Sequence, residues 1–170
     1  MTRNALMLSA AGALALAACS KKAPEQLPPQ PTPTPTAVAT ATPTVTGPAP
    51  GTQGHFQRAM QGQDTIYFDT DRYNIDSQDQ AALRSQAQYF LAYPQSRVTV
   101  EGHADERGTR DYNLALGERR ANATKNFLVG LGVDAGRITT ISYGKERPVA
   151  TGSDAQAWAR NRRAVSVVIN

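Results

Sequence analysis

The sequence predicts an α/β protein of the α+β kind, a two-layer sandwich with its helices on one face of a mixed sheet. Segments typical of strands and helices follow one another from residue 63 onward, in the order strand, helix, strand, helix, strand, short helix, strand. The expected helices are longer than the strands and the connections are short, which favours helices packed against a single sheet. The chain shows no internal repeat and no second apolar cluster, so we expect one folded domain, residues 63–170.

The first strand and the first helix have clear signals. Residues 65–68 read Thr-Ile-Tyr-Phe, a β-branched and aromatic run that favours a strand. Ser77 and Gln80 fit a capping box, in which each side chain satisfies a backbone N–H at the start of a helix. Apolar residues then recur at helical spacing until Pro94 ends the helix.

The remaining elements follow from the same signals. Residues 97–101 alternate as a strand, and Thr109 is a natural N-cap for a second helix, with Asp111 in its favourable first turn. We expect Trp158 to be a packing anchor. The last three elements are a strand, a short helix and a strand, at residues 138–143, 153–161 and 163–170.

The N-terminus is typical of a secreted protein. Residues 1–18 carry one early positive charge, at Arg3, before a run of small residues and leucine that is too short to span a membrane. Cys19 follows directly, which resembles a bacterial lipobox, where the cysteine is acylated and becomes the first mature residue. The alternative is a free or buried cysteine after ordinary cleavage. Ser20 follows, and by the same resemblance this favours an outer-membrane anchor facing the periplasm.

Residues 19–62 are expected to form a flexible linker that begins at the lipidated cysteine. Proline, threonine and alanine dominate the segment, and the alternating prolines of residues 31–35 favour extended polyproline II. Such a composition lacks the large apolar side chains that a core needs. His55, near the end of this segment, is expected to be exposed and without partners.

Composition excludes several classes of function. The 170 residues include 18 Lys and Arg against 14 Asp and Glu, a net charge of +4. Because the two signs are interleaved, no basic stripe of the kind that binds nucleic acid is evident. The single cysteine rules out an intramolecular disulfide and a cysteine-rich metal site.

A charge-dense loop after the second strand is the candidate site. An arginine matches a carboxylate with two parallel hydrogen bonds, and an aspartate can hold an ammonium. We therefore expect Asp105 in the loop and Arg120 on the next helix to bind a zwitterion, with Arg120 facing a groove and not the core. Asn113 and Arg120 are seven residues apart, on one stripe of that helix. An equally strong alternative makes Asp105 an ordinary surface charge paired with Arg107 or Arg119.

A metal or hydrolase site is the third hypothesis for this loop, built from Glu101, His103, Asp105 and Glu106. A catalytic zinc usually has three protein ligands and a water, and the only other histidine is His55. No serine or cysteine is paired with a base in the way that covalent catalysis requires. We therefore expect no enzyme activity, no catalytic residue, no metal and no cofactor.

The motifs together resemble a known family. They are Tyr-Phe-Asp-Thr-Asp at 67–71, Glu-Gly-His-Ala-Asp-Glu-Arg-Gly-Thr at 101–109, Tyr-Asn at 112–113, Leu-Gly-Glu-Arg-Arg-Ala at 116–121, Ser-Tyr-Gly-Lys-Glu-Arg-Pro at 142–148 and Asn-Arg-Arg-Ala-Val at 161–165. This set resembles the OmpA-like peptidoglycan-binding domain family, specifically its lipid-anchored branch. The resemblance covers nearly all of the chain from Thr65 onward.

The resemblance implies non-covalent binding of peptidoglycan through the diaminopimelate of its stem peptide. Asp105 and Arg120 match the pair that grips the ammonium and the carboxylate of that residue. Other matching positions line the same pocket: Asn113, Leu116, Arg107 and Asp71. The family also implies a protein partner, the periplasmic propeller TolB. The alternatives are an envelope adaptor of the same family without TolB and, from another class, a cell-wall hydrolase.

Overall fold

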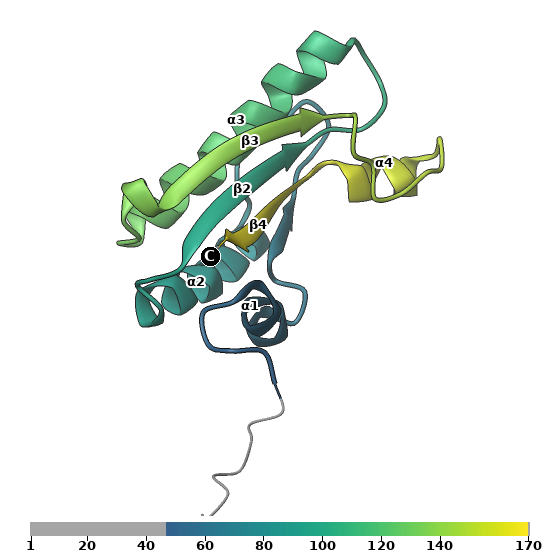
Figure 1. Ribbon diagram of the computed structural model, residues 1–170. Coiled ribbons are helices and arrows are strands. Elements are labelled where there is room, and N and C mark those ends of the chain that lie inside the picture. Colours follow the sequence, from purple (N-terminus) through teal and green to yellow (C-terminus); the bar gives the residue numbers. More distant parts are fainter. Residues whose placement is uncertain (1–46, 170) are drawn as a thin grey trace, which may run out of the picture. The chain divides into compact units, whose positions relative to one another are not determined.

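The computed structural model describes residues 47–169 (Figure 1). Its α-helices are α1 (Gln53–Met60), α2 (Ser77–Ala92), α3 (Arg110–Gly130) and α4 (Ala155–Asn161), and a short 3-10 helix spans Ala135–Arg137. Its strands are β1 (Thr65–Tyr67), β2 (Arg97–His103), β3 (Ile138–Gly144) and β4 (Arg163–Ile169). None of the helices within this range is long and apolar enough to cross a membrane.

The four strands form one mixed sheet in the order β1-β4-β2-β3. Strand β4 pairs antiparallel with both β1 and β2, whereas β2 and β3 are parallel. A parallel pair needs a long crossover connection, and α3 supplies it. Helices α2 and α3 lie behind the sheet in Figure 1, and the front face of the sheet is left without a helical layer. The predicted two-layer α+β architecture is confirmed.

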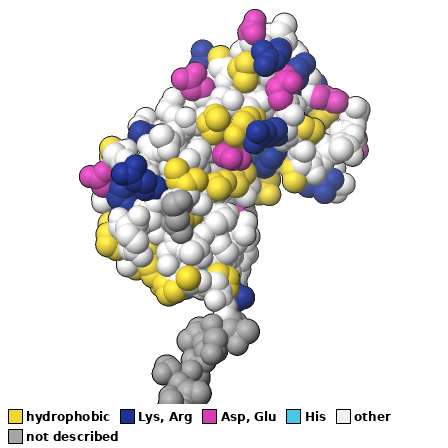
Figure 2. Space-filling model, viewed as in Figure 1, with side chains coloured by type: hydrophobic (Ala, Val, Ile, Leu, Met, Phe, Trp, Pro, Cys, Tyr) yellow, Lys and Arg dark blue, Asp and Glu magenta, His cyan; other side chains and the backbone are white. Residues whose placement is uncertain are grey.

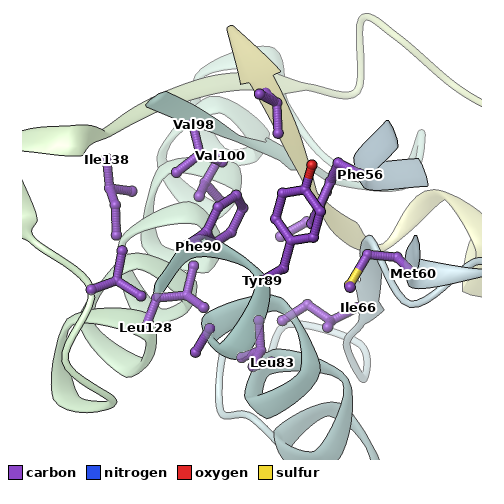
Figure 3. Close-up of a cluster of buried hydrophobic side chains, with 14 of the residues drawn as sticks. Phe56, Met60, Ile66, Leu83, Tyr89, Phe90, Val98, Val100, Leu128 and Ile138 are labelled. Carbon is purple, nitrogen blue, oxygen red and sulfur yellow. The ribbon is translucent and has the colours of Figure 1, made fainter. Parts of the chain in front are cut away.

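The hydrophobic core lies between the sheet and its helices (Figure 3). Alternation along β2 points Val98 and Val100 inward, and both are fully buried. Helix α2 contributes Leu83 and Phe90 from one face, and α3 contributes Leu128. This core fixes α3 against the sheet, and α3 carries much of the candidate site.

The linker interpretation was wrong at its C-terminal end, because helix α1 is part of the folded domain. Phe56 is fully buried, and its ring stacks on that of Phe90 with centroids 5.1 Å apart. His55 Nδ1 lies 2.9 Å from the Tyr89 hydroxyl, so His55 has a partner, contrary to expectation. The two buried apolar residues of α1, Phe56 and Met60, are too few to have marked a helix in the sequence. The predicted signal peptide, Cys19 and most of the predicted linker lie outside the described residues.

Helix α2 begins differently from the predicted capping box. Its N-cap is Asp76, whose carboxylate accepts a 2.8 Å hydrogen bond from the backbone N–H of Asp79. The helix was placed correctly, but the capping residue is one position earlier than Ser77. For α3 the predicted cap is confirmed, since the Thr109 hydroxyl accepts from the N–H of Tyr112.

The buried carboxyl group of Asp79 makes the free energy of unfolding depend on pH. The side chain is 8% exposed, and its carboxylate accepts a 3.2 Å hydrogen bond from the N–H of Tyr67. Burial raises the pKa of Asp79 to about 6; the bond from Tyr67 partly offsets this, and nearby Asp76 adds to it. Because the folded-state pKa lies above the unfolded value of 3.8, folding is favoured by protonation. This contribution is fully present below pH 3.8 and is lost as the pH rises through about 6.

Asp79→Asn is therefore expected to raise the free energy of unfolding at pH 7, by roughly 2–3 kcal/mol. The difference between variant and wild type should vanish towards pH 3.5, where both side chains are neutral. Urea unfolding at several pH values measures it. Asp111→Asn, at an exposed acidic position in the first turn of α3, is the control and should change stability by less than about 0.5 kcal/mol. A stability gain independent of pH would contradict the explanation.

The open face of the sheet mixes apolar and charged side chains (Figure 2). Tyr67, Ile141 and Ile169 are the large hydrophobic residues of the four strands that remain exposed. On the same view, positive and negative side chains are interspersed and form no single-sign field. This agrees with the interleaved charges of the sequence.

Candidate functional site

A pocket of about 270 Å³ lies where three loops meet the N-terminal half of α3. It brings together all six residues that the sequence assigned to a binding site, and adds four that it did not. The ten lining residues are Thr70, Asp71, Asp105, Arg107, Gly108, Tyr112, Asn113, Leu116, Arg120 and Arg162.

The connection between β2 and α3 forms one wall of the pocket, and the structure holds it firmly. The amide of Asn113 donates a 2.7 Å hydrogen bond to the carbonyl of Arg107. From the other side, Lys145 Nζ donates to the carbonyls of Glu106 and Gly108, at 3.2 and 2.7 Å. A loop whose middle is fixed by side-chain donors from two elements presents its functional groups at defined positions.

Asp105 is buried, 7% exposed, and is held by two arginines. Arg107 donates to it from Nε and Nη2, at 3.0 and 2.7 Å, and from its backbone N–H. Arg162 Nη1 adds a longer contact of 3.4 Å. Burial alone would raise the pKa of Asp105, but the hydrogen bonds from Arg107 and Arg162 outweigh it and lower the pKa below its usual value. The carboxylate is therefore charged at neutral pH.

The alternative of an ordinary surface charge is thus right that Asp105 pairs with Arg107. It is wrong that Asp105 is exposed. An ion pair on the surface is screened by water, whereas this aspartate lies within the pocket. Arg119 makes no ion pair with Asp105 among the described residues.

Arg120 is buried, contrary to the expectation that it faces only the groove. It is 0% exposed and closes the floor of the pocket. Its guanidinium donates to three backbone carbonyls, those of Arg72 at 2.9 Å, His103 at 2.8 Å and Asp69 at 3.0 Å. Burial, followed by the charge of Arg162, lowers its pKa to about 10, so it is charged at neutral pH. The residue both borders the site and ties α3 to the loop after β1 and to the end of β2.

Asp71 occupies the opposite side of the pocket. It lies in the loop after β1 with a left-handed backbone, φ 56°, which aspartate tolerates better than most residues. Its carboxylate accepts a 3.1 Å hydrogen bond from the Tyr112 hydroxyl, so loop and helix meet here. The sequence placed Asp71 in the pocket by resemblance, whereas nothing in the local pattern marked Tyr112 as its partner.

Arg162 is a contribution that sequence reasoning missed, whereas Trp158 is the packing anchor that the sequence predicted. Arg162 lines the pocket and also donates at 2.8 Å to the carbonyl of Phe68. Trp158 does not line the pocket; its ring lies 4.3 Å from the guanidinium carbon of Arg107, and its N–H donates to Glu106. It therefore packs against the binding loop, as an anchor that orients Arg107. The only signal for Arg162 was its place in the Asn-Arg-Arg motif.

The metal hypothesis finds no support in the geometry. Within residues 47–169, no group of three or more His, Cys, Asp or Glu side chains could hold a metal ion. His103 Nε2 lies 3.7 Å from Glu101, and its ring faces that of Tyr143 at 5.5 Å. Burial, then the charges of Arg163 and Arg147, lower the pKa of His103 to about 4. The histidine is neutral at physiological pH.

The charges of the pocket add up to a small positive excess. Three guanidinium groups and two carboxylates line it, which leaves a net charge of +1. A neutral zwitterion would leave that excess uncompensated, whereas a ligand with one ammonium and two carboxylates would balance it. The pocket therefore suits a ligand that carries both signs with an anionic surplus.

Comparison with known proteins identifies relatives over nearly the whole chain. The model of the OmpA family matches residues 67–162. The peptidoglycan-associated lipoprotein of Rhizobium meliloti (strain 1021) is 46% identical over 168 residues, which covers 99% of this chain and 89% of that protein. The protein of the same name from Brucella melitensis is 55% identical over 105 residues, 62% of each chain.

Solved structures of related proteins have the same fold. The crystal structure of the peptidoglycan-associated lipoprotein from Burkholderia pseudomallei matches with a TM-score of 0.64 and 43% identity, covering 66% of this chain and 96% of that one. The C-terminal domain of Helicobacter pylori MotB, at 19% identity, 63% and 84% coverage and a TM-score of 0.59, shares the fold. The chain belongs to the OmpA family and, within it, is a homologue of the peptidoglycan-associated lipoproteins.

Proposed function

We propose that this protein binds peptidoglycan non-covalently, through the diaminopimelate residue of the stem peptide, and so ties the outer membrane to the cell wall. The observation that carries the proposal is a single pocket holding a buried carboxylate, Asp105, and a buried guanidinium, Arg120. The names of the relatives support the same ligand class.

The roles of the two residues follow from their charges. The ammonium at the end of the diaminopimelate side chain would contact Asp105. The carboxylate on the same carbon would contact Arg120. The guanidinium of Arg120 has five N–H groups and donates to three carbonyls, so N–H groups remain for a ligand. A lysine-containing stem lacks that carboxylate and would leave the charge of Arg120 unmatched. The pair of Asp105 and Arg120 would therefore bind a diaminopimelate stem more tightly than a lysine stem.

The positive excess of the pocket fits a stem peptide better than a free zwitterion. A stem has further carboxylates, at the main chain of diaminopimelate or of the residues around it. Arg107 and Arg162, at the Asp105 side of the pocket, offer guanidinium groups that such a carboxylate could share. No catalytic step is proposed.

The membrane anchor is the second half of the proposal. Acylation of Cys19 at the end of the signal peptide would give an outer-membrane lipoprotein facing the periplasm, and relatives that align over this region are named lipoproteins. Stable anchoring needs more than one acyl chain. From the family resemblance we also infer TolB as a protein partner at an overlapping surface.

Asp105→Asn is expected to release the purified protein from peptidoglycan sacculi, because the amide removes the charge that holds the ammonium while keeping the side-chain shape. Breaking one half of such a pair typically costs about 2 kcal/mol or more, a loss of at least about 30-fold in affinity. Co-sedimentation with sacculi measures it.

Asp111→Asn, at an exposed acid outside the pocket, is the matched control and should pellet like the wild type. A circular dichroism spectrum of each variant verifies that it is folded. If folded Asp105→Asn protein sedimented with sacculi as well as the wild type does, the site assignment would be wrong. Release of soluble fragments from the sacculi would favour the hydrolase hypothesis instead.

A further inference from the structure

Two more hollows lie beside the pocket, and the second of them borders α3. The loop after β1 lines the first, of about 390 Å³, with residues 71–74. Tyr73 reaches on into the second, of about 340 Å³, whose other lining residues are Arg119, Asn122, Ala123 and Asn126. Asp71 is shared by the pocket and the first hollow, and Tyr73 by the first and the second. The three are therefore adjacent, and each shares one lining residue with the next.

The second hollow, called the far hollow below, is lined by the ring of Tyr73 and by polar side chains that have free hydrogen-bonding groups. Tyr73 is 49% exposed, and Arg119 and Asn126 are also exposed. Among the described residues, no hydrogen bond or ion pair engages these three side chains, whereas Asn122 accepts one from the Thr140 hydroxyl and keeps its amide N–H groups. Neighbouring polar side chains that do not bond to one another remain available to a ligand.

These groups suit a sugar and do not suit a metal ion. Amides and a guanidinium hydrogen-bond to hydroxyl and acetamido groups, and a phenol ring presents a flat apolar face with a polar tip. Ala123, a small residue that also lines the hollow, leaves room for a ring to approach the helix. The hollow contains no carboxylate to ligate a cation and only one positive charge, that of Arg119.

The spacing along α3 fits the covalent structure of peptidoglycan. Leu116 in the pocket and Asn122 in the far hollow are six residues apart, about 9 Å along the helix axis. Two residues separate diaminopimelate from the lactyl group of N-acetylmuramic acid, and three extended residues span about 11 Å, or somewhat more here because the glutamate is linked through its side chain. A stem held in the pocket can thus place its sugar in the far hollow.

We propose that Tyr73, Arg119, Asn122 and Asn126 form a glycan subsite, which binds the N-acetylated amino sugars of the strand whose stem peptide occupies the pocket. The inference rests on the proposed function and extends it from the peptide to the sugar. Each strand would then be held at two points, so that uncrosslinked stems still attached to their glycan would be preferred over free peptides.

Calorimetric titration of the purified protein with two ligands tests this. One is the diaminopimelate-containing stem tripeptide, and the other is the same tripeptide attached to N-acetylglucosaminyl-N-acetylmuramic acid. The wild type should bind the second about 5- to 30-fold more tightly, the effect of one or two added hydrogen bonds and a ring contact. Tyr73→Ala and, independently, Asn126→Ala should reduce that ratio towards one while the affinity for the tripeptide stays unchanged.

Arg84→Ala, at an exposed arginine on α2 that lines none of the three hollows, should keep the wild-type ratio. Equal affinities of the wild type for the two ligands would overturn the subsite and leave the peptide pocket intact. A ratio that persists in both variants would overturn it too. Binding of neither ligand would overturn the proposed function, and the subsite with it.

Discussion

Arg120→Ala should be the most damaging single substitution in the pocket, because it affects folding and binding together. The guanidinium satisfies the carbonyls of Arg72, His103 and Asp69, and alanine would leave all three without this donor, in a buried position for His103 and a partly buried one for the other two. Each orphaned group costs about 1–3 kcal/mol, partly offset by relief of the desolvated charge. We expect a loss of roughly 3–5 kcal/mol in the free energy of unfolding, together with the loss of peptidoglycan binding.

Urea unfolding measures the stability term, and Arg119→Ala is its control. Arg119 is the neighbouring residue on α3 but is exposed, so its removal should change stability by less than about 0.5 kcal/mol. Arg120→Lys separates charge from geometry, since lysine keeps the charge but cannot reach three carbonyls from one planar group. Wild-type stability of Arg120→Ala would show that the carbonyl contacts contribute nothing.

Gly102→Ala is expected to separate the helix from the sheet. A Cβ at Gly102 would lie 1.8 Å from the carbonyl oxygen of Gly117 and 3.2 Å from the Cβ of Ala121. The clash is with backbone, which cannot rotate away, so α3 must move off β2. We expect a loss of about 3 kcal/mol or more, at the upper end for overpacked sites. Because α3 carries Asn113, Leu116 and Arg120, sacculus binding should weaken as well.

Gly130→Ala is the matched control on the same helix. Nothing lies within 4 Å of a Cβ at this position, and its backbone is helical. Alanine there should be neutral or stabilise the protein by up to about 1 kcal/mol. Thermal unfolding of the two variants side by side makes the comparison. An equally mild effect of Gly102→Ala would mean that the two elements are not in backbone contact.

The sequence predicted the elements whose signals are local. Thr109 caps α3 because its hydroxyl reaches an N–H three residues on, and such a contact is visible in the spacing alone. Strands β2 and β4 were predicted from alternation. The loop from Glu101 to Thr109 was recognised as a candidate site because it gathers more charge than a connection needs.

Features that depend on distant partners could not be predicted in this way. The guanidinium of Arg120 is held by two carbonyls of the loop after β1, 48 and 51 residues away, and no pattern on α3 reports that. Helix α1 was missed because its buried Phe56 packs on a ring from α2 and has few apolar neighbours in sequence. Arg162 joins Asp105 from 57 residues away. In each case tertiary contacts override a weak local signal.

Calorimetric titration of the purified protein with stem peptides is the most direct test of the proposed ligand. One peptide contains diaminopimelate and the other contains lysine at the same position, so the two differ only by the carboxylate assigned to Arg120. We predict that the protein binds the first peptide and binds the second at least about 30-fold more weakly. Equal affinity for both peptides, or binding of neither, would contradict it.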